Sequence, residues 1–369
     1  MSFSKRMSRI KPSGIRAVQK RIAGKSDMIS FAAGLPDPAL YPLEDLRKAA
    51  DTMLEKEGAT AFAYGLTKGY GPLLDYLTDR MNNREHVECT KENICILSGS
   101  QQGLGLAAMT FLDEGDVVIT ENPSYLGAIN AFRPYGAEFV GVDTDDDGIV
   151  IEDLERALEE NPNTKLIYVI PNFQNPTGKA WTLERRERFM EVVAKYDVAV
   201  VEDNPYGDLR FKGEPLPHLR ALDKKGQVIY LGSFSKILSP GMRVAWTCAS
   251  KEVATAFESL KETNDLQSPE LTQMLTYYYL KMFDLEKHIE EIQVVYKERC
   301  ELMVEMIRKY FPDEIKYTDP EGGMFLWLEL PEGLDSDAIL DDALAAGIAY
   351  IPGESFFSFD GVKNTIRMN

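Results

Sequence analysis

Lys236 is the residue whose type and neighbours most clearly suggest chemistry in this chain. It follows the apolar run 228–232, Ser233 and Ser235 precede it closely, and Arg243 comes seven residues later. A lysine amine can form a Schiff base with a phosphorylated aldehyde cofactor, while hydroxyl groups and a guanidinium neutralise the phosphate. A single lysine at a strand end is more often a solvated charge. Whether Lys236 is a Schiff-base lysine or a solvated charge depends on whether the rest of a cofactor pocket is present elsewhere in the chain.

Two further polar groups follow apolar stretches earlier in the chain. Ser100 and Gln101 come directly after Gly99 and open a helical pattern, where free amide groups favour an anion such as a phosphate. The competing explanation is an ordinary helix cap. Tyr125 follows the next apolar stretch, and its ring could stack on a flat heteroaromatic ring or simply pack in the core.

The remaining polar groups lie between residues 172 and 206. Asn175 could hydrogen-bond a ring oxygen, or it could serve turn chemistry alone. Asp203 ends the very apolar stretch 198–201, where a carboxylate is costly unless it is paired with a cation such as a protonated pyridine nitrogen. Tyr206 is near enough to reach a phenolic oxygen on the same ring. Asp203 could instead cap the next turn. Each of these five polar groups has a local explanation, but all five local explanations would have to hold independently. We therefore favour a single binding site for one phosphorylated pyridine.

The elements that must position these groups alternate between short apolar runs and helical patterns. The predicted strands span 94–97, 117–120, 138–142, 166–170, 198–202, 228–231 and 243–247, with helical patterns at 101–111, 152–159 and 182–196. This alternation predicts an α/β domain with a mainly parallel seven-stranded sheet flanked by helices. Ligands of such sheets gather at the carboxyl ends of the strands, where the polar groups fall.

The pattern changes after residue 251. Long charged helical stretches at 251–261 and 269–310 precede a hydrophobic strand at 323–330, a helix at 336–346 and a short strand near 348–351. We therefore expect a large domain at 46–262 and a smaller α+β domain at 263–369. Residues 1–45 are expected to form a helix and a loop that pack on the small domain or on a partner chain.

Composition restricts the class of protein. The chain has 369 residues, a net charge of −18 and a sequence pI near 4.8, which argues against a nucleic-acid or anionic-membrane surface. No apolar run approaches the length of a membrane span, and the basic N-terminus lacks a signal core, so we expect a cytoplasmic protein. Four scattered cysteines are typical of reduced, buried thiols, and three scattered histidines predict no metal site.

Together these motifs resemble fold-type I pyridoxal-phosphate enzymes, and more narrowly class I/II aminotransferases of the kynurenine/2-aminoadipate subgroup. The resemblance covers nearly the whole chain, from the segment 31–36 to the segment 364–367. It implies that Lys236 forms the internal aldimine and moves the proton, and that Asp203 keeps the pyridine nitrogen protonated. It also implies that Asn175 and Tyr206 bond the ring oxygen and that Tyr125 stacks on the ring. The residues implied for the phosphate are Ser100, Gln101, Ser233, Ser235 and Arg243.

The resemblance also implies substrate contacts and a partner. Arg367 matches the arginine that pairs with the substrate α-carboxylate, and Gly34 would lie over the substrate, near Asn175. Tyr64 matches a tyrosine that reaches the phosphate of the other subunit, which implies a homodimer with shared active sites. Relatives continue into a final helix beyond Arg367, so we expect either that the sequence is cut short or that the small domain lacks this helix, and the second case would leave Arg367 near a frayed end.

The resemblance implies transfer of an amino group from an L-amino acid to a 2-oxo acid, with 2-oxoglutarate as acceptor and ping-pong kinetics. Arg16 matches a side-chain-recognising arginine, which favours 2-aminoadipate or glutamate-like donors, although it equally fits the polar face of an amphipathic helix. Two alternatives stay open at this point. One is a pyridoxal-phosphate-dependent β-lyase, and the other is a non-catalytic sensing module like those of some transcription regulators.

Overall fold

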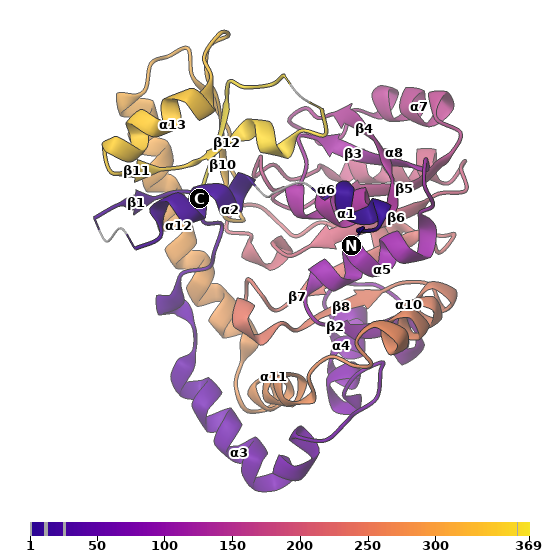
Figure 1. The fold of residues 1–369 in the computed structure, drawn as a ribbon. Coiled ribbons are helices and arrows are strands. Elements are labelled where there is room, and N and C mark those ends of the chain that lie inside the picture. The colour runs from indigo at the N-terminus through magenta and orange to yellow at the C-terminus, as the bar shows by residue number, and fades with distance from the viewer. Residues whose placement is uncertain (1, 11–13, 25–26, 360) are drawn as a thin grey trace.

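A seven-stranded sheet forms the centre of the computed structural model, which describes residues 2–10, 14–24, 27–359 and 361–369 (Figure 1). Its strand order is β2-β8-β7-β6-β5-β3-β4, and β8 alone runs antiparallel to its neighbours. The strands are β2 (Ile94–Leu97), β3 (Val117–Asn122), β4 (Glu138–Asp143), β5 (Thr164–Val169), β6 (Ala199–Asn204), β7 (Val228–Ser233) and β8 (Ala245–Cys248). The predicted α/β fold with a mainly parallel sheet is confirmed.

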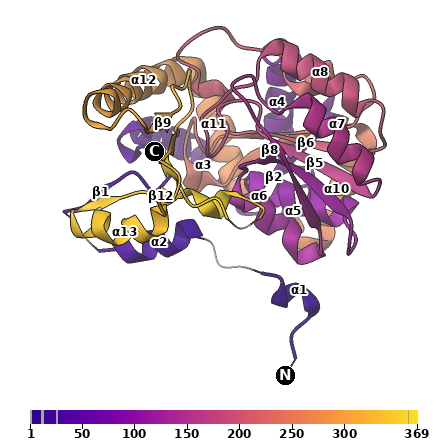
Figure 2. The same ribbon diagram turned by 90° about the horizontal axis from the view of Figure 1, so that it is seen from above.

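Helices cover both faces of this sheet (Figure 2). Apolar side chains of the strands alternate between two cores, one on each face. On β5, Leu166 and Tyr168 enter one core, while Ile167 and Val169 enter the other. The first core is shared by α3 (Leu43–Ala61), α4 (Gly71–Asn83), α5 (Ser100–Phe111), α6 (Leu126–Phe132), α10 (Lys251–Asn264) and α11 (Glu270–Met282). The second is shared by α7 (Ile151–Glu160), α8 (Leu183–Val193) and α9 (Leu219–Leu222).

A four-stranded antiparallel sheet forms a smaller layer beside the large one, in the order β12-β13-β10-β9. Its strands are β9 (Lys316–Tyr317), β10 (Leu326–Glu329), β12 (Ile351–Pro352) and β13 (Thr365–Met368), and its core includes residues of α13 (Ser336–Ala345) and of the end of α12 (Leu285–Tyr310). The N-terminal segment joins this layer, because β1 (Ile29–Ser30) pairs with β11 (Ile348–Ala349) and Val18 of α2 (Gly14–Ile22) enters the same core. The short helix α1 (Lys5–Ser8) lies apart from this layer and contacts the turn Arg133–Tyr135 after α6, where Arg6 lies over the ring of Tyr135.

Several predicted elements differ from the structure. The stretch 269–310 is two helices, because the chain turns at Phe283 and the Asp284 side chain caps α12 by accepting from two backbone amides. Residues 348–351 form two short strands that belong to different sheets. Apolar side chains of α11 and of the start of α12 pack in the core of the large sheet.

Strand β13 carries Arg367 and was not predicted from the sequence. It lies between β12 and β10, and only 1% of the Arg367 surface is exposed. The expectation of a frayed end at this arginine is therefore wrong, because pairing on both sides holds the strand in place.

Candidate active site

A cavity of about 710 Å³ lies at the carboxyl ends of β5, β6 and β7, between the large sheet and the small one. Nearly all the predicted site residues line it. They are Arg16, Gly34, Ser100, Gln101, Tyr125, Asn175, Asp203, Tyr206, Ser233, Ser235, Lys236, Arg243 and Arg367. Tyr64 is absent from this lining, and its side chain is 86% exposed in the isolated chain.

Lys236 lies in the turn that follows β7, and its amine faces the cavity. Its Nζ donates to the carbonyl of Gly34 at 3.1 Å and lies 5.8 Å from the ring centroid of Tyr206. Burial, assisted by the positive charges of Arg367 and Arg243, lowers the pKa of Lys236 to about 8. A larger part of this amine is therefore uncharged near neutral pH than in a solvated lysine, which suits a nucleophile or a general base.

Asp203 lies near the end of β6 and is almost completely buried. Its Oδ2 accepts a hydrogen bond of 2.8 Å from the Tyr168 hydroxyl, while its buried Oδ1 has no hydrogen-bond partner among the described residues. Burial raises the pKa of Asp203 to about 6, although the Tyr168 hydrogen bond and the Lys236 charge oppose this rise. The unpartnered oxygen can accept a hydrogen bond from a cationic N–H donor.

The loop before α5 and the turn after β7 together form an anion site. Gly99 has a φ of 84°, and a Cβ there would lie 1.9 Å from Arg243 Nη2, so the guanidinium lies directly against the backbone. The Ser100 hydroxyl at the start of α5 is buried without a partner, and Arg243 Nη2 donates to the Ser98 carbonyl at 3.3 Å. This arrangement offers helix amides, a hydroxyl and a guanidinium to a phosphate.

Other predicted phosphate residues extend the anion site. The Ser233 hydroxyl donates to that of Ser235 at 2.9 Å and also accepts from the Ser235 amide at 3.0 Å. Gln101 uses its side-chain amide to bond the Gly127 carbonyl at 3.0 Å, and its backbone remains part of the helix start. Both groups therefore border the anion site.

Arg367 lines the cavity from β13 of the small sheet and is joined to Asn175. Its Nη1 donates to Asn175 Oδ1 at 3.0 Å and its Nη2 to the Ala32 carbonyl at 2.9 Å, while its buried Nε has no hydrogen-bond partner in the described chain. The guanidinium also lies over the ring of Phe325, 4.5 Å from the centroid. Burial lowers the pKa of Arg367 to about 10, so it still carries its charge at neutral pH.

Three contacts define the walls between these groups. Asn175 Nδ2 donates to the Tyr206 hydroxyl at 3.4 Å, which places both polar groups side by side. Tyr125 ends against Gly127, where a Cβ would lie 2.4 Å from its ring. Gly34 has a φ of 61°, and a Cβ there would lie 3.2 Å from Phe325. Small residues thus keep the cavity open.

Arg16 reaches the mouth of the cavity from α2, next to Gln19. Its charge acts on Tyr125, whose pKa burial raises. The structure therefore brings Arg16 to the site although 159 residues separate it from Asn175 and 187 separate it from Asp203 in the chain.

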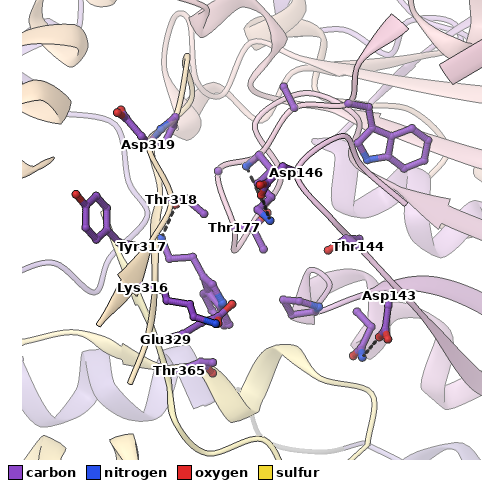
Figure 3. A pocket seen from close by; sticks show the side chains of 18 of the residues that line it. Asp143, Thr144, Asp146, Thr177, Lys316, Tyr317, Thr318, Asp319, Glu329 and Thr365 are labelled. Atoms are coloured by element: carbon purple, nitrogen blue, oxygen red, sulfur yellow. Dashed lines mark hydrogen bonds and ion pairs between the residues drawn. The ribbon is translucent and has the colours of Figure 1, made fainter. Parts of the chain in front are cut away.

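A second cavity, of about 850 Å³, lies on the other side of the loop that carries Asn175 (Figure 3). Thr144, Asp146 and Thr177 face Lys316, Thr318 and Glu329 across it, and neither Lys236 nor Asp203 lines it. Its size exceeds that of the first cavity, but it lacks the lysine, the buried carboxylate and the anion site. The chemistry therefore belongs to the smaller cavity.

Three buried residues that support the site were missed from the sequence. Tyr168 resembled an ordinary strand residue, because tyrosine favours strands. Glu121 accepts from the Ile170 amide and from the Trp181 indole, both at 2.9 Å, and thereby fixes the loop of Asn175. An acid inside the apolar run 117–122 was a usable signal, of the same kind as Asp203. Lys261 is fully buried on α10 and bonds Gln102 at 3.2 Å, which no local pattern revealed.

The cysteines differ partly from expectation. Cys89 and Cys300 are half-buried rather than buried. Cys89 also hydrogen-bonds Cys248, and this contact lowers the pKa of Cys89. In the described ranges no group of three or more His, Cys, Asp or Glu side chains could hold a metal ion, and no helix there is long and apolar enough to cross a membrane.

The residues around the smaller cavity fit pyridoxal phosphate. The unpartnered Asp203 Oδ1 suits a protonated ring nitrogen, and the unpartnered Ser100 hydroxyl suits a phosphate oxygen. Lys236 supplies an amine in the same cavity. Each unsatisfied buried group would otherwise carry a desolvation penalty of about 1–3 kcal/mol, so a ligand that satisfies them is favoured.

Known proteins resemble this chain over its whole length. The family model of aminotransferase class I and II matches residues 26–369. Aromatic-amino-acid aminotransferase 1 of Thermococcus litoralis is 42% identical over 100% of this chain and 89% of its own length. The 2-aminoadipate transaminase of Thermus thermophilus is 39% identical over 100% of this chain and 91% of its own length.

A solved structure gives the same result in three dimensions. The crystal structure of Pyrococcus horikoshii kynurenine aminotransferase has a TM-score of 0.95 at 40% identity, covering 100% of this chain and 91% of that one. The chain therefore belongs to the aminotransferase class I and II family, and its activity is pyridoxal-phosphate-dependent transfer of an amino group.

Proposed function

We propose that this chain transfers the amino group of an L-amino acid to 2-oxoglutarate in a ping-pong reaction. The observation that carries this proposal is the meeting of Lys236, the free Asp203 oxygen and Arg367 in one cavity. When bound, pyridoxal phosphate supplies an electrophilic carbon and a ring that accepts the electron pair released at the substrate α-carbon.

The chain's own residues then have separate tasks. Lys236 holds the cofactor covalently and moves a proton to and from the substrate α-carbon, because its lowered pKa leaves it able to act as acid and base near neutral pH. Asp203 stays ionised above about pH 6 and keeps the ring nitrogen protonated. Tyr206 and Asn175 hydrogen-bond the ring oxygen, and Tyr125 stacks on the ring.

Two cationic groups define which molecules fit. Arg367 binds the substrate α-carboxylate with the N–H groups that Asn175 and Ala32 leave free, a bidentate geometry that lysine cannot reproduce. The phosphate is held by Ser100, Gln101, Ser233, Ser235 and Arg243. Gly34 leaves space above the substrate.

The donor is proposed from Arg16 and from the names of the relatives. Those relatives are named for aromatic amino acids, 2-aminoadipate and kynurenine. Because Arg16 lies at the mouth of the cavity, we propose that it pairs with the distal carboxylate of 2-aminoadipate or glutamate. An aromatic side chain would occupy the same mouth without using this charge.

The proposal includes a cytoplasmic homodimer with shared active sites. Tyr64 is exposed in the isolated chain, and in the dimer it would reach the phosphate of the partner subunit. Phe62 and Leu66 beside it are also exposed, at 74% and 72%, which is consistent with a covered face.

The test is a panel of amino acids assayed with purified protein, pyridoxal phosphate and 2-oxoglutarate. Formation of glutamate is expected, and Lys236→Ala should lower the rate by about a hundredfold or more, because the covalent link and the proton transfer are both lost. Turnover must stop when 2-oxoglutarate is omitted. Continued release of pyruvate and ammonia without an acceptor would instead indicate a β-lyase, and parental activity in Lys236→Ala would refute the mechanism.

A further inference from the structure

We propose that Tyr168 is a positioning residue for Asp203, which fixes one carboxylate oxygen so that the other faces the ring nitrogen of the cofactor. The inference rests on the role proposed for Asp203 and extends it to a residue that does not itself line the cavity. Tyr168 is fully buried, with 0% of its surface exposed.

The sheet register explains how two residues from different strands meet. Strands β5 and β6 are parallel neighbours, with Tyr168 opposite Val201. Asp203 is two residues beyond Val201, and side chains two apart point to the same face of a sheet. The tyrosine side chain is long enough to lean along the strand, and its hydroxyl reaches Asp203 Oδ2 at 2.8 Å.

The two oxygens of Asp203 therefore have different environments. Oδ2 is occupied by Tyr168, and Oδ1 is buried without a partner in the described chain while Asp203 lines the cavity. A carboxylate with one fixed oxygen cannot rotate freely, so the free oxygen keeps its direction toward the cavity. The hydrogen bond thus orients the group and leaves its cation-binding oxygen available.

The hydroxyl also favours the ionised form of Asp203. Burial raises the pKa of this carboxyl to about 6, and the Tyr168 hydrogen bond opposes that rise. The titratable and charged groups that act on this site are Lys236 from the turn after β7, Tyr206 after β6, and Tyr125 at the start of α6. Among these three groups only Lys236 adds a positive charge, and Lys236 is the residue proposed to hold the cofactor covalently.

Packing alone does not explain a tyrosine at position 168. The ring contacts Phe132 edge to face at a centroid distance of 6.0 Å, and phenylalanine would keep that contact. The hydroxyl adds a polar atom to the protein interior, which is unfavourable unless the atom is hydrogen-bonded. Its bond to Asp203 meets this requirement.

The experiment compares Tyr168→Phe with the parent through the pH dependence of pyridoxal-phosphate affinity, measured by absorbance titration from pH 5 to 8.5 without any amino acid. In the parent, affinity should fall below about pH 6, where Asp203 becomes protonated. In the variant, the midpoint of this fall should move up by about one to two pH units. The reason is that a hydrogen bond to a charged group stabilises it by an amount that corresponds to about one to two pKa units. At pH 6 the variant should bind about fivefold to fiftyfold more weakly.

The matched control is Tyr230→Phe. Tyr230 is a buried tyrosine on β7 whose hydroxyl accepts from Asn204 at 2.9 Å, so its loss also removes one buried hydrogen bond beside Asp203. It should lower the melting temperature about as much as Tyr168→Phe and leave the affinity midpoint at the parental pH. In an Asp203→Asn background, Tyr168→Phe should produce no shift, since no carboxylate remains to titrate.

Three outcomes would overturn the inference. If the affinity midpoint of Tyr168→Phe lies at the parental pH, the role of Tyr168 is refuted, while the proposed amino-group transfer by the parent still stands. An equal shift in Tyr230→Phe would assign the effect to general loosening of the sheet. A parent that binds no pyridoxal phosphate would refute the proposed function and this inference together, whereas a parent that binds it but transfers no amino group refutes the proposed function only.

Discussion

Gly99→Ala is the substitution for which the structure gives the clearest magnitude. Gly99 has φ 84° and ψ 156°, a backbone conformation that is essentially restricted to glycine and costs other residues about 1–3 kcal/mol. In addition, the new Cβ would lie 1.9 Å from Arg243 Nη2 and 2.6 Å from its Cζ. Because Arg243 is exposed, we expect its side chain to move away from the phosphate position rather than the chain to unfold.

We therefore expect two separate effects from this one methyl group. The free energy of unfolding, measured by urea denaturation, should fall by about 1–3 kcal/mol from backbone strain. The affinity for pyridoxal phosphate should fall at least about tenfold, because a charge-assisted hydrogen bond to the phosphate is lost. Absorbance titration of the folded variant measures the second effect independently of the first.

Gly105→Ala is the matched control on the same helix. A Cβ at Gly105 would meet nothing within 4 Å, and Gly105 is not among the residues with positive φ. This variant should be more stable than the parent by about 0.5–1 kcal/mol and should keep its cofactor affinity. The reasoning is refuted if Gly99→Ala unfolds within about 0.5 kcal/mol of the parent, the usual spread of neutral surface changes, and binds the cofactor equally well.

Three other predictions concern charge. The lowered pKa of Lys236 predicts that attachment of pyridoxal phosphate to the apoprotein accelerates with rising pH and levels off above about pH 8, as followed by stopped-flow absorbance; a midpoint near the ordinary lysine value would contradict it. Lys261→Met should lower the free energy of unfolding by roughly 1–3 kcal/mol, because Gln102 loses a hydrogen-bond donor and the Asp265 carboxylate loses its cation. An unchanged urea midpoint would show that this buried amine does not contribute to stability. Arg367→Lys should raise KM for amino acids by about tenfold to a hundredfold while the cofactor spectrum stays parental, and an unchanged KM would remove it from the substrate site.

Part of the site could be predicted because each motif is local. Asp203 lies near the end of a buried strand and Lys236 follows the neighbouring strand, so parallel pairing places both at the same edge of the sheet. The seven strands were recognisable for the same reason, since each apolar run is bounded by polar or turn residues. The limits of the short strands in the small sheet were less predictable, because two-residue pairings depend on their neighbours.

The sequence by itself determined the fold class and the type of cofactor, because five polar groups recur at the ends of apolar strands whatever the details of packing. Only the tertiary structure decided which groups support them. Tyr168 and Asp203 meet through the register of two strands, and Arg367 meets Asn175 through the contact of two sheets. The physical reason is that a hydrogen bond requires a direction and a distance of about 3 Å, and the spacing of residues along the chain specifies neither for partners far apart in sequence.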